Sequence, residues 1–330
     1  MKGAMIPELK LPDIYFEPVW GELYAIKDKG IHQVFLFNSI YGQVYYSFVK
    51  RIIDIKIDGE TYFDIITPYG FSGPVVLNNK TGKRDELLRE FKGAFDNYCN
   101  ENRIVTDSCR FNPWLKNHVD FTHMYELVPN YTTVGIDLSV NNIFSDELNY
   151  SKRKNIRKAE RLGVTIHFSF ENKYIDCFLA LYEKTIIKNK ISDYYRFSKD
   201  FLLDNFEKLR GRIFFAFAEY EKKIISITIF LLSENYIHAH IGANDTDYWQ
   251  IPANDALIYQ VAEYGKKNGY QYLMLGGGAG NQALHFHKIK FTRNSEFDFF
   301  KGRRICNPDA YNKILLNCKK IDNSFFPSYR

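Results

Sequence analysis

The chain has 330 residues, of which 45% are hydrophobic, 17% aromatic and 25% charged. This composition excludes a disordered or fibrous protein, and the length suits about two domains. The formal net charge of +5 favours an anionic partner but is too small for a protein that packages nucleic acid.

The sequence carries no signal for export or membrane insertion. Its N-terminal segment lacks an apolar core, and no run approaches the roughly 20 apolar residues that a membrane span needs. The five cysteines are widely spaced and form no CxxC pair, which fits a reducing compartment. We therefore expect a cytoplasmic protein that associates with the inner face of a membrane at most peripherally. The oligomeric state stays open.

The first half of the chain is rich in strand patterns. Four segments predict strands: residues 32–37, 42–49, 51–57 and 61–67. Apolar residues spaced by three and four then predict a helix over 83–99, and a further strand follows at 104–111.

A basic segment at 150–164 opens the second half, with six Lys or Arg residues between Lys152 and Arg161. Its apolar residues fall at helical spacing, which predicts an amphipathic cationic helix. Charge runs of this kind usually form a solvated face. The sharper interpretation is a phosphate-binding helix, because Arg and Lys both bind phosphate oxygens. Its candidate phosphate ligands are Lys152, Arg153, Arg157 and Lys158.

The rest of the second half repeats the order of the first. The predicted elements are strands at 212–220, 224–232 and 236–242, a helix at 253–269 and a strand at 270–276. This repetition suggests an internal duplication. We expect the fold class α/β (α+β), with two tandem domains whose mixed sheets are flanked by helices and with a cleft between them.

Three glycines follow the last of these strands and lead into a short basic segment. Gly276, Gly277 and Gly278 lack a Cβ, so a ligand or a second strand can approach the main chain closely there. The join also brings backbone N–H groups and Lys288 to one place. We interpret it as the floor of an active site.

At this point a family resemblance becomes visible. The segment SKRKNIRKAERLGV (151–164) resembles the signature of the Fem family of peptidoglycan interpeptide-bridge aminoacyltransferases. Further blocks are similar to ones shared by that family and related GNAT-like (acetyltransferase superfamily) N-acyltransferases: residues 67–74, 110–115, 133–139, 181–202, 276–278 and 287–291. The resemblance implies GNAT-like domains at 1–145 and 146–300, with the active-site lysine in the second, and a tail at 301–330 that packs back on a lobe.

The resemblance also implies roles for individual residues. The segment HKIKF (287–291) is similar to the family's FKxxF element, which makes Lys288 the catalytic-site lysine and puts His287 in place of the usual Phe. Thr185 and Lys188 match a Thr and Arg pair, although lysine loses the bidentate fork. Two residues of the first lobe, Tyr69 and Gly70, line the acceptor side of the expected cleft.

The implied reaction moves an aminoacyl group from aminoacyl-tRNA to an amine of a peptidoglycan precursor, with no tightly bound cofactor. An ester is already activated, so stabilising the oxyanion is the main task, for which Lys288 and the N–H groups of residues 276–278 are candidates. The base stays open among His287, His285, Asp245 and a phosphate of the substrate.

The runner-up is an acyl-CoA-dependent GNAT-type N-acyltransferase that acts on an amino sugar or a surface polymer. Neither half contains the glycine-rich loop with which ordinary GNAT enzymes hold the CoA pyrophosphate, and residues 245–255 contain no glycine. This absence ranks acyl-CoA below tRNA as the donor.

Three rival classes fit less well. A metal site rests on two HxH pairs, His238/His240 and His285/His287, each of which would share a face on a strand, but no Cys ligand or HExxH helix accompanies them. Residues 278–283 fit GxGxxA, yet too little chain follows for a dinucleotide-binding fold. An RNA-binding module would stack bases on aromatic residues such as Tyr195, and turnover separates it from an enzyme.

Overall fold

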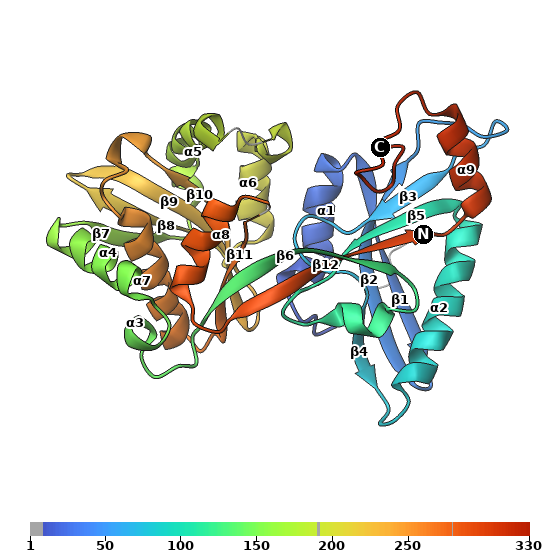
Figure 1. The fold of residues 1–330 in the computed structure, drawn as a ribbon, viewed down its shortest axis with the longest axis horizontal. Helices are drawn as coiled ribbons and strands as arrows, with labels where there is room; N and C mark the ends of the chain where they lie inside the picture. Colours follow the sequence, from blue (N-terminus) through green and yellow to red (C-terminus); the bar gives the residue numbers. More distant parts are fainter. Residues whose placement is uncertain (1–8, 190–191, 279) are drawn as a thin grey trace. The chain divides into compact units, whose positions relative to one another are not determined.

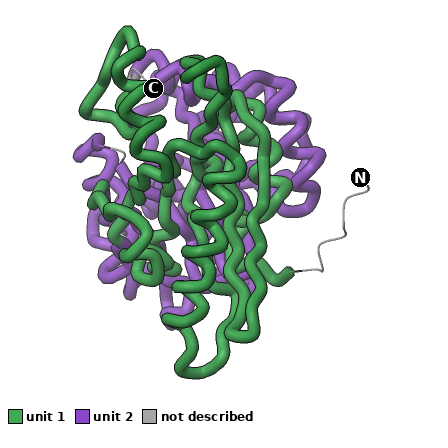
Figure 2. The backbone as a smooth tube through the Cα atoms, turned by 90° about the vertical axis from the view of Figure 1, so that its right-hand side faces the viewer, with its two compact units in different colours: residues 1–130, 298–330 green, residues 131–297 purple. Residues whose placement is uncertain are grey.

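The computed structural model describes residues 9–189, 192–278 and 280–330. The chain divides into two compact units, coloured separately in Figure 2: unit 1 comprises residues 1–130 and 298–330, and unit 2 comprises residues 131–297. The boundaries between the units fall inside two strands, β6 (Glu126–Asp137) and β12 (Glu296–Ile305). Every helix within the described ranges is too short or too polar to cross a bilayer.

Unit 1 is built on a mixed sheet in the order β1-β2-β3-β5-β12, with β4 beside β2. Strands β3 and β5 run parallel, and the other pairs within the unit are antiparallel. The elements, of which Figure 1 labels the α-helices and strands, are η1 (Ile14–Phe16), α1 (Pro18–Lys27), β1 (Gly30–Ser39), β2 (Gly42–Ile52), β3 (Phe63–Ile66), β4 (Val75–Asn79), α2 (Arg84–Glu101), β5 (Ile104–Arg110), η2 (Asn117–Phe121) and α9 (Pro308–Asn317).

The alternation of β2 explains how helices cover this sheet. Tyr46 and Phe48 point to one face, where they pack against Phe95 of α2. Tyr45 points to the other face and packs against Phe16 of η1, whose carbonyl accepts a hydrogen bond from the Tyr45 hydroxyl. Because successive side chains of a strand point to opposite faces, one strand supplies both layers of the core.

Unit 2 contains six further strands in the order β6-β11-β10-β9-β8-β7, in which β10 and β11 are parallel. Its remaining elements are α3 (Ile143–Asp146), α4 (Tyr150–Arg161), β7 (Thr165–Ser169), η3 (Asn172–Tyr174), α5 (Ile175–Asn189), η4 (Asp193–Tyr195), α6 (Lys199–Lys208), β8 (Ile213–Tyr220), β9 (Lys223–Leu232), β10 (Tyr236–Asn244), η5 (Thr246–Tyr248), α7 (Ala253–Lys267), β11 (Tyr272–Gly277), α8 (Gln282–Lys288) and η6 (Ile289–Phe291).

Helices cover both faces of the unit 2 strands (Figure 1). On one face, Leu257 and Val261 of α7 belong to the same buried cluster as Phe214 of β8. On the other face, Phe206 of α6 stacks on Phe215, the next residue of β8, at 4.7 Å between ring centroids. The expected fold class, mixed sheets flanked by helices, is therefore confirmed.

One predicted strand is wrong. The pattern at 51–57 is not a separate strand, because β2 continues to Ile52 and only an isolated bridge joins Ile57 to Glu60. Ile53 and Ile57 are nevertheless buried, in a cluster with Val105 of β5 and Tyr311 of α9. Their alternation reflects burial against α9 rather than pairing in the sheet.

Candidate active site

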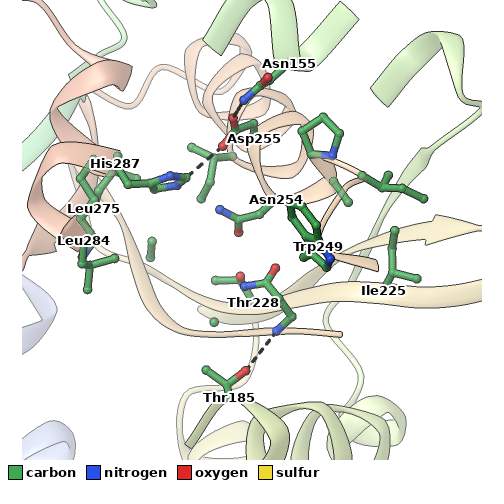
Figure 3. Close-up of a pocket in the computed structure, with 18 of the residues that line it drawn as sticks. Asn155, Thr185, Ile225, Thr228, Trp249, Asn254, Asp255, Leu275, Leu284 and His287 are labelled. Atoms are coloured by element: carbon green, nitrogen blue, oxygen red, sulfur yellow. Dashed lines mark hydrogen bonds and ion pairs between the residues drawn. The ribbon is translucent and has the colours of Figure 1, made fainter. Parts of the chain in front are cut away.

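A cavity of about 630 Å³ lies in unit 2 where the parallel strands β10 and β11 separate. Their pairing runs from Tyr236 opposite Tyr272 to His238 opposite Met274. Beyond this point β10 stays paired with β9, and β11 stays paired with β6. The side chains of the separated strand ends line the cavity, as does the first turn of α7 (Figure 3).

A bulge in β10 contributes a histidine to the cavity. The register between β10 and β9 shifts between Ala239 and Ile241, which leaves His240 as the extra residue. Burial, and then the charge of His238, lower the pKa of His240 to about 3. The imidazole is therefore uncharged at neutral pH.

The N-terminus of α7 also faces the cavity, which Ala253, Asn254 and Asp255 line. The N-cap residue, Pro252, makes no side-chain cap hydrogen bond, and the N–H of Ala253 donates to the Ile251 carbonyl at 2.8 Å. Unpaired N–H groups and the helix dipole place partial positive charge at such an end. This end of the cavity favours a negatively charged or polarised oxygen.

Lys288 brings a second positive group to the cavity, at the last position of α8. Its Nζ donates a hydrogen bond of 2.9 Å to the carbonyl of Gly277, and burial lowers the pKa of Lys288 to about 8. At pH 7 the ammonium still carries its proton. The structure thus brings Lys288 to the glycines, as the sequence predicts.

The glycines let neighbouring groups approach the main chain closely, because they have no side chain and tolerate unusual backbone angles. Gly276 has φ of +67°, a conformation that side chains disfavour, and a Cβ on Gly277 would lie 2.2 Å from the Tyr131 ring. Gly278 accepts a hydrogen bond from the N–H of Asn281, the residue whose side chain caps α8. The close neighbours are a second strand, β6, and the turn into α8.

Behind the cavity lies a buried ion pair that the sequence analysis does not foresee. Lys152 Nζ lies 2.7 Å from one oxygen of Asp255, and the side-chain amide of Asn155 donates to the other oxygen at 2.7 Å. A ring nitrogen of His287 lies 3.1 Å from Lys152 Nζ (Figure 3 shows His287 and Asn155 on either side of Asp255). Burial, and then the Lys152 charge, lower the pKa of His287 to about 4.

This pairing differs from the phosphate-binding role expected of Lys152. Only 2% of its side chain is exposed, because Lys152 lies on the same buried stripe of α4 as Ile156 and Ala159. Its ammonium contacts Asp255 and lies 4.1 Å from the centre of the Phe291 ring. We therefore correct the expectation: Lys152 is part of the interior that supports the cavity.

The other expected cations of α4 lie nearer the surface. Lys158 is exposed and donates to the carbonyl of Gln250 at 2.9 Å. The Arg157 guanidinium is also exposed and lies 5.1 Å from the Phe144 ring centre. Arg153 is half-buried, and its guanidinium donates to the Leu148 carbonyl.

The remaining expected residues of unit 2 lie on the other side of the sheet. Thr185 of α5 lines the cavity, and its hydroxyl accepts a hydrogen bond from the N–H of Asn244. Lys188 is exposed near the end of α5 and is not part of the cavity lining. Tyr195 also lies outside the lining, and its carbonyl accepts from the Tyr182 hydroxyl at 3.0 Å.

Two of the candidate bases are occupied by charged neighbours. Asp245 forms ion pairs with Lys184 at 2.8 Å and Lys223 at 2.9 Å. Burial alone would raise the pKa of Asp245, but hydrogen bonds from the two lysines outweigh it and bring the pKa to about 2. His285 lies 3.6 Å from Glu296 and, unlike His287, is not among the residues that line the cavity. The structure thus leaves His287 and a substrate phosphate as the better candidates.

The histidine pairs do not share strand faces. His285 and His287 lie on helix α8, where residues two apart point in different directions, and the bulge at His240 breaks the alternation with His238. No group of three or more metal-ligating side chains occurs in the part of the chain that the structure describes.

Tyr69 and Gly70 belong to unit 1 and are fixed within it. The Tyr69 carbonyl accepts a hydrogen bond of 2.6 Å from the Trp20 indole, and the Tyr69 ring stacks on Tyr24. Gly70 has φ of +107°, and a Cβ there would meet the Tyr15 ring at 2.4 Å. Only glycine fits this turn.

Residues 148–286, which include most of the cavity lining, match the family model described as an acetyltransferase (GNAT) domain. Over both units, the fold is similar to that of FemX, with a TM-score of 0.71 and 10% identity, covering 92% of this chain and 95% of FemX. The expected resemblance to the Fem and GNAT-like proteins is confirmed at the level of the fold.

Two further structures share this fold. One is the C-terminal domain of a putative lysylphosphatidylglycerol synthetase from Agrobacterium fabrum, with a TM-score of 0.52 and 13% identity over 90% of this chain and 93% of that one. The other is L-PGS from Bacillus licheniformis, with a TM-score of 0.52 and 13% identity over 95% and 97%. No curated protein matches the chain by sequence.

Several cavity residues escape the sequence analysis. Asn155 and Asp255 lie 100 residues apart and meet only in the fold. Trp249 lies in the loop after the predicted strand 236–242, and Asn254 lies in the first turn of the predicted helix 253–269. This position between a strand and a helix is the one feature of the sequence that points to them.

Proposed function

We propose that this chain transfers an aminoacyl group from aminoacyl-tRNA to an amine of a peptidoglycan precursor. The observation that carries the proposal is the cavity within residues 148–286 and their neighbours, which both Lys288 and the first turn of α7 line. The similarity of the whole fold to FemX, a Fem-family protein, supports the choice of substrates. Because tRNA is charged in the cytoplasm, the reaction requires a cytoplasmic, bacterial protein.

In the proposed reaction the neutral acceptor amine attacks the ester carbonyl of the donor. A C–N bond forms, the C–O ester bond breaks, and the amine proton ends on the ribose hydroxyl that leaves. The Lys288 ammonium and the N–H groups of α7 stabilise the oxyanion of the intermediate. The uncharged ring of His287 accepts the amine proton and passes it on. Because the pKa of His287 is low, the protonated ring gives the proton up readily.

The loop between β10 and α7 supports tRNA over acyl-CoA as the donor. Ordinary GNAT enzymes cradle the CoA pyrophosphate with glycine N–H groups at this place, whereas residues 245–252 here contain no glycine. Asp245 instead ties the loop to Lys184 and Lys223. An acyl-CoA-dependent N-acyltransferase acting on an amino sugar or a surface polymer is the second candidate, which the GNAT family match favours.

Phosphate binding is assigned to the exposed cations Arg157 and Lys158 of α4, with Arg153 beside them. Thr185 is the cavity residue best placed to contact the transferred group from the α5 side. On the acceptor side, we retain Tyr69 and Gly70 of unit 1 as candidates by family resemblance.

The donor is identified by a transfer assay with purified protein. Total tRNA charged with radiolabelled amino acids and, separately, labelled acetyl-CoA are each offered a pool of peptidoglycan precursors and a pool of amino sugars. We expect transfer from tRNA to the precursors, abolished by ribonuclease. Transfer only from acetyl-CoA would replace this function with the second candidate, and no transfer from either would contradict both.

The pH dependence of the reaction provides a further prediction. We expect kcat/KM to fall as pH rises above about 8, because the pKa of Lys288 lies there and the ammonium is present below this pH and lost above it. In Lys288→Arg the guanidinium stays charged, so this falling limb should be absent up to pH 10. A falling limb at the same pH in both proteins would assign it to another group.

A further inference from the structure

A second hollow lies at the surface beside the cavity of unit 2. This groove, of about 540 Å³, is lined by Asn155, Lys158, Trp249, Gln250 and Pro252. Three of these residues, Asn155, Trp249 and Pro252, also line the cavity. The groove and the cavity are therefore direct neighbours.

Trp249 is an exposed aromatic surface on a fixed backbone. Its side chain is 74% exposed, and it follows directly after η5. On one side, the backbone N–H of Ile251 donates to the Tyr248 carbonyl at 2.9 Å. On the other side, the buried Asp245 begins the loop and caps η5. The loop holds the indole outward instead of folding it onto the core.

A cation borders this platform. Lys158 Nζ uses one of its hydrogens on the carbonyl of Gln250, the residue after Trp249, and the lysine is otherwise exposed. An ammonium has three donors, so two remain for a ligand. The described residues that line the groove include no carboxylate, and Asp255 of the neighbouring cavity has both oxygens engaged by Lys152 and Asn155. The groove therefore combines an open π-face with positive charge.

We propose that the Trp249–Lys158 groove binds the adenine nucleotide of the acyl donor, with the base stacked on Trp249 and a phosphate on Lys158. This rests on the proposed function. Both candidate donors carry this chemistry: aminoacyl-tRNA bears its acyl group on a terminal adenosine that is linked to a phosphate, and coenzyme A contains a phosphorylated adenosine. An aromatic face with a neighbouring cation is the usual way to bind such a group without reading its sequence.

The test is a binding measurement that requires no turnover. The probes are a non-hydrolysable aminoacyl-adenosine 5′-phosphate, in which an amide replaces the ester, coenzyme A, and ribose 5-phosphate as the probe without a base. Calorimetry gives the affinities. Trp249→Ala should weaken at least one adenosine probe about 10-fold or more, and Trp249→Phe should restore most of the loss, because base stacking on an aromatic side chain contributes about that much.

Matched variants and salt complete the design. Tyr150→Ala removes an aromatic side chain that is 73% exposed but lies outside both hollows, and it should leave affinity unchanged. Lys158→Ala should reduce the salt dependence of binding, whereas Lys154→Ala, on the same helix, should not.

The two donor sources give different results. A loss confined to the aminoacyl-adenosine probe assigns the groove to tRNA, and a loss confined to coenzyme A assigns it to acyl-CoA. Unchanged affinity of both in Trp249→Ala, or binding of neither, overturns the proposal. If Trp249→Ala lowers affinity while no donor supports transfer, the proposed function fails and the subsite stands.

Discussion

Replacing Lys288 with alanine is expected to lower kcat about 100- to 1000-fold, the usual cost of removing one oxyanion-stabilising donor. The effect should appear mainly in kcat, because the ammonium acts on charge that develops only in the transition state. Steady-state kinetics with the donor identified by the transfer assay measures it. The fold should persist, because the Lys288 ammonium donates to the backbone carbonyl of Gly277 and the loss of this hydrogen bond removes little stability.

The neighbouring lysine supplies the control for this experiment. Lys290 is exposed and does not line the cavity, so Lys290→Ala should retain most of the activity. Circular dichroism and thermal unfolding of both variants separate lost chemistry from lost structure. Full activity in Lys288→Ala would remove the lysine from the mechanism.

The second large effect concerns stability. Lys152→Met is expected to reduce the free energy of unfolding by about 3–5 kcal/mol, because it leaves the Asp255 carboxylate buried without its ion-pair partner. The two side chains are 2% and 5% exposed, so water does not compensate the charge. Urea unfolding of the wild type and the variant measures the difference.

A double variant tests whether the ion pair itself is responsible. In Lys152→Met with Asp255→Asn the carboxylate is gone, and the asparagine still accepts a hydrogen bond from Asn155, so most of the lost stability should return. Lys154→Met, on an exposed position of α4, should cost less than about 0.5 kcal/mol. If the double variant is as unstable as the single one, packing rather than charge explains the loss.

The strands of the second half were predictable because they are buried on both faces. The predicted segments 212–220 and 224–232 are largely apolar runs with turn residues between them, and the observed β8 (Ile213–Tyr220) and β9 (Lys223–Leu232) follow them closely. The short strands β4 and β7 lack such a signal, because most of their residues are half-buried or exposed. Alternation misleads at 51–57, where two buried isoleucines face α9 without joining the sheet.

The candidate site was predictable only in part. Lys288 could be found because glycines precede it closely in the sequence. The Lys152–Asp255 contact could not, because its partners lie 103 residues apart. The basic segment also shows why charge runs are ambiguous: with 3.6 residues per turn, a run of lysines and arginines places some members on the buried stripe of its helix. Lys152 is that member.

The discontinuity of unit 1 has a consequence for how the protein is made. Strand β5 pairs with residues 301–305 of β12, and Val105 of β5 packs against α9. These partners are translated after all of unit 2. A ribosome-bound chain can therefore pair the strands of unit 2 first, while β5, paired with β3, still lacks its neighbour on the other side. The N-terminal part of unit 1 must stay unfinished, and in need of protection from aggregation, until β12 and α9 have been translated.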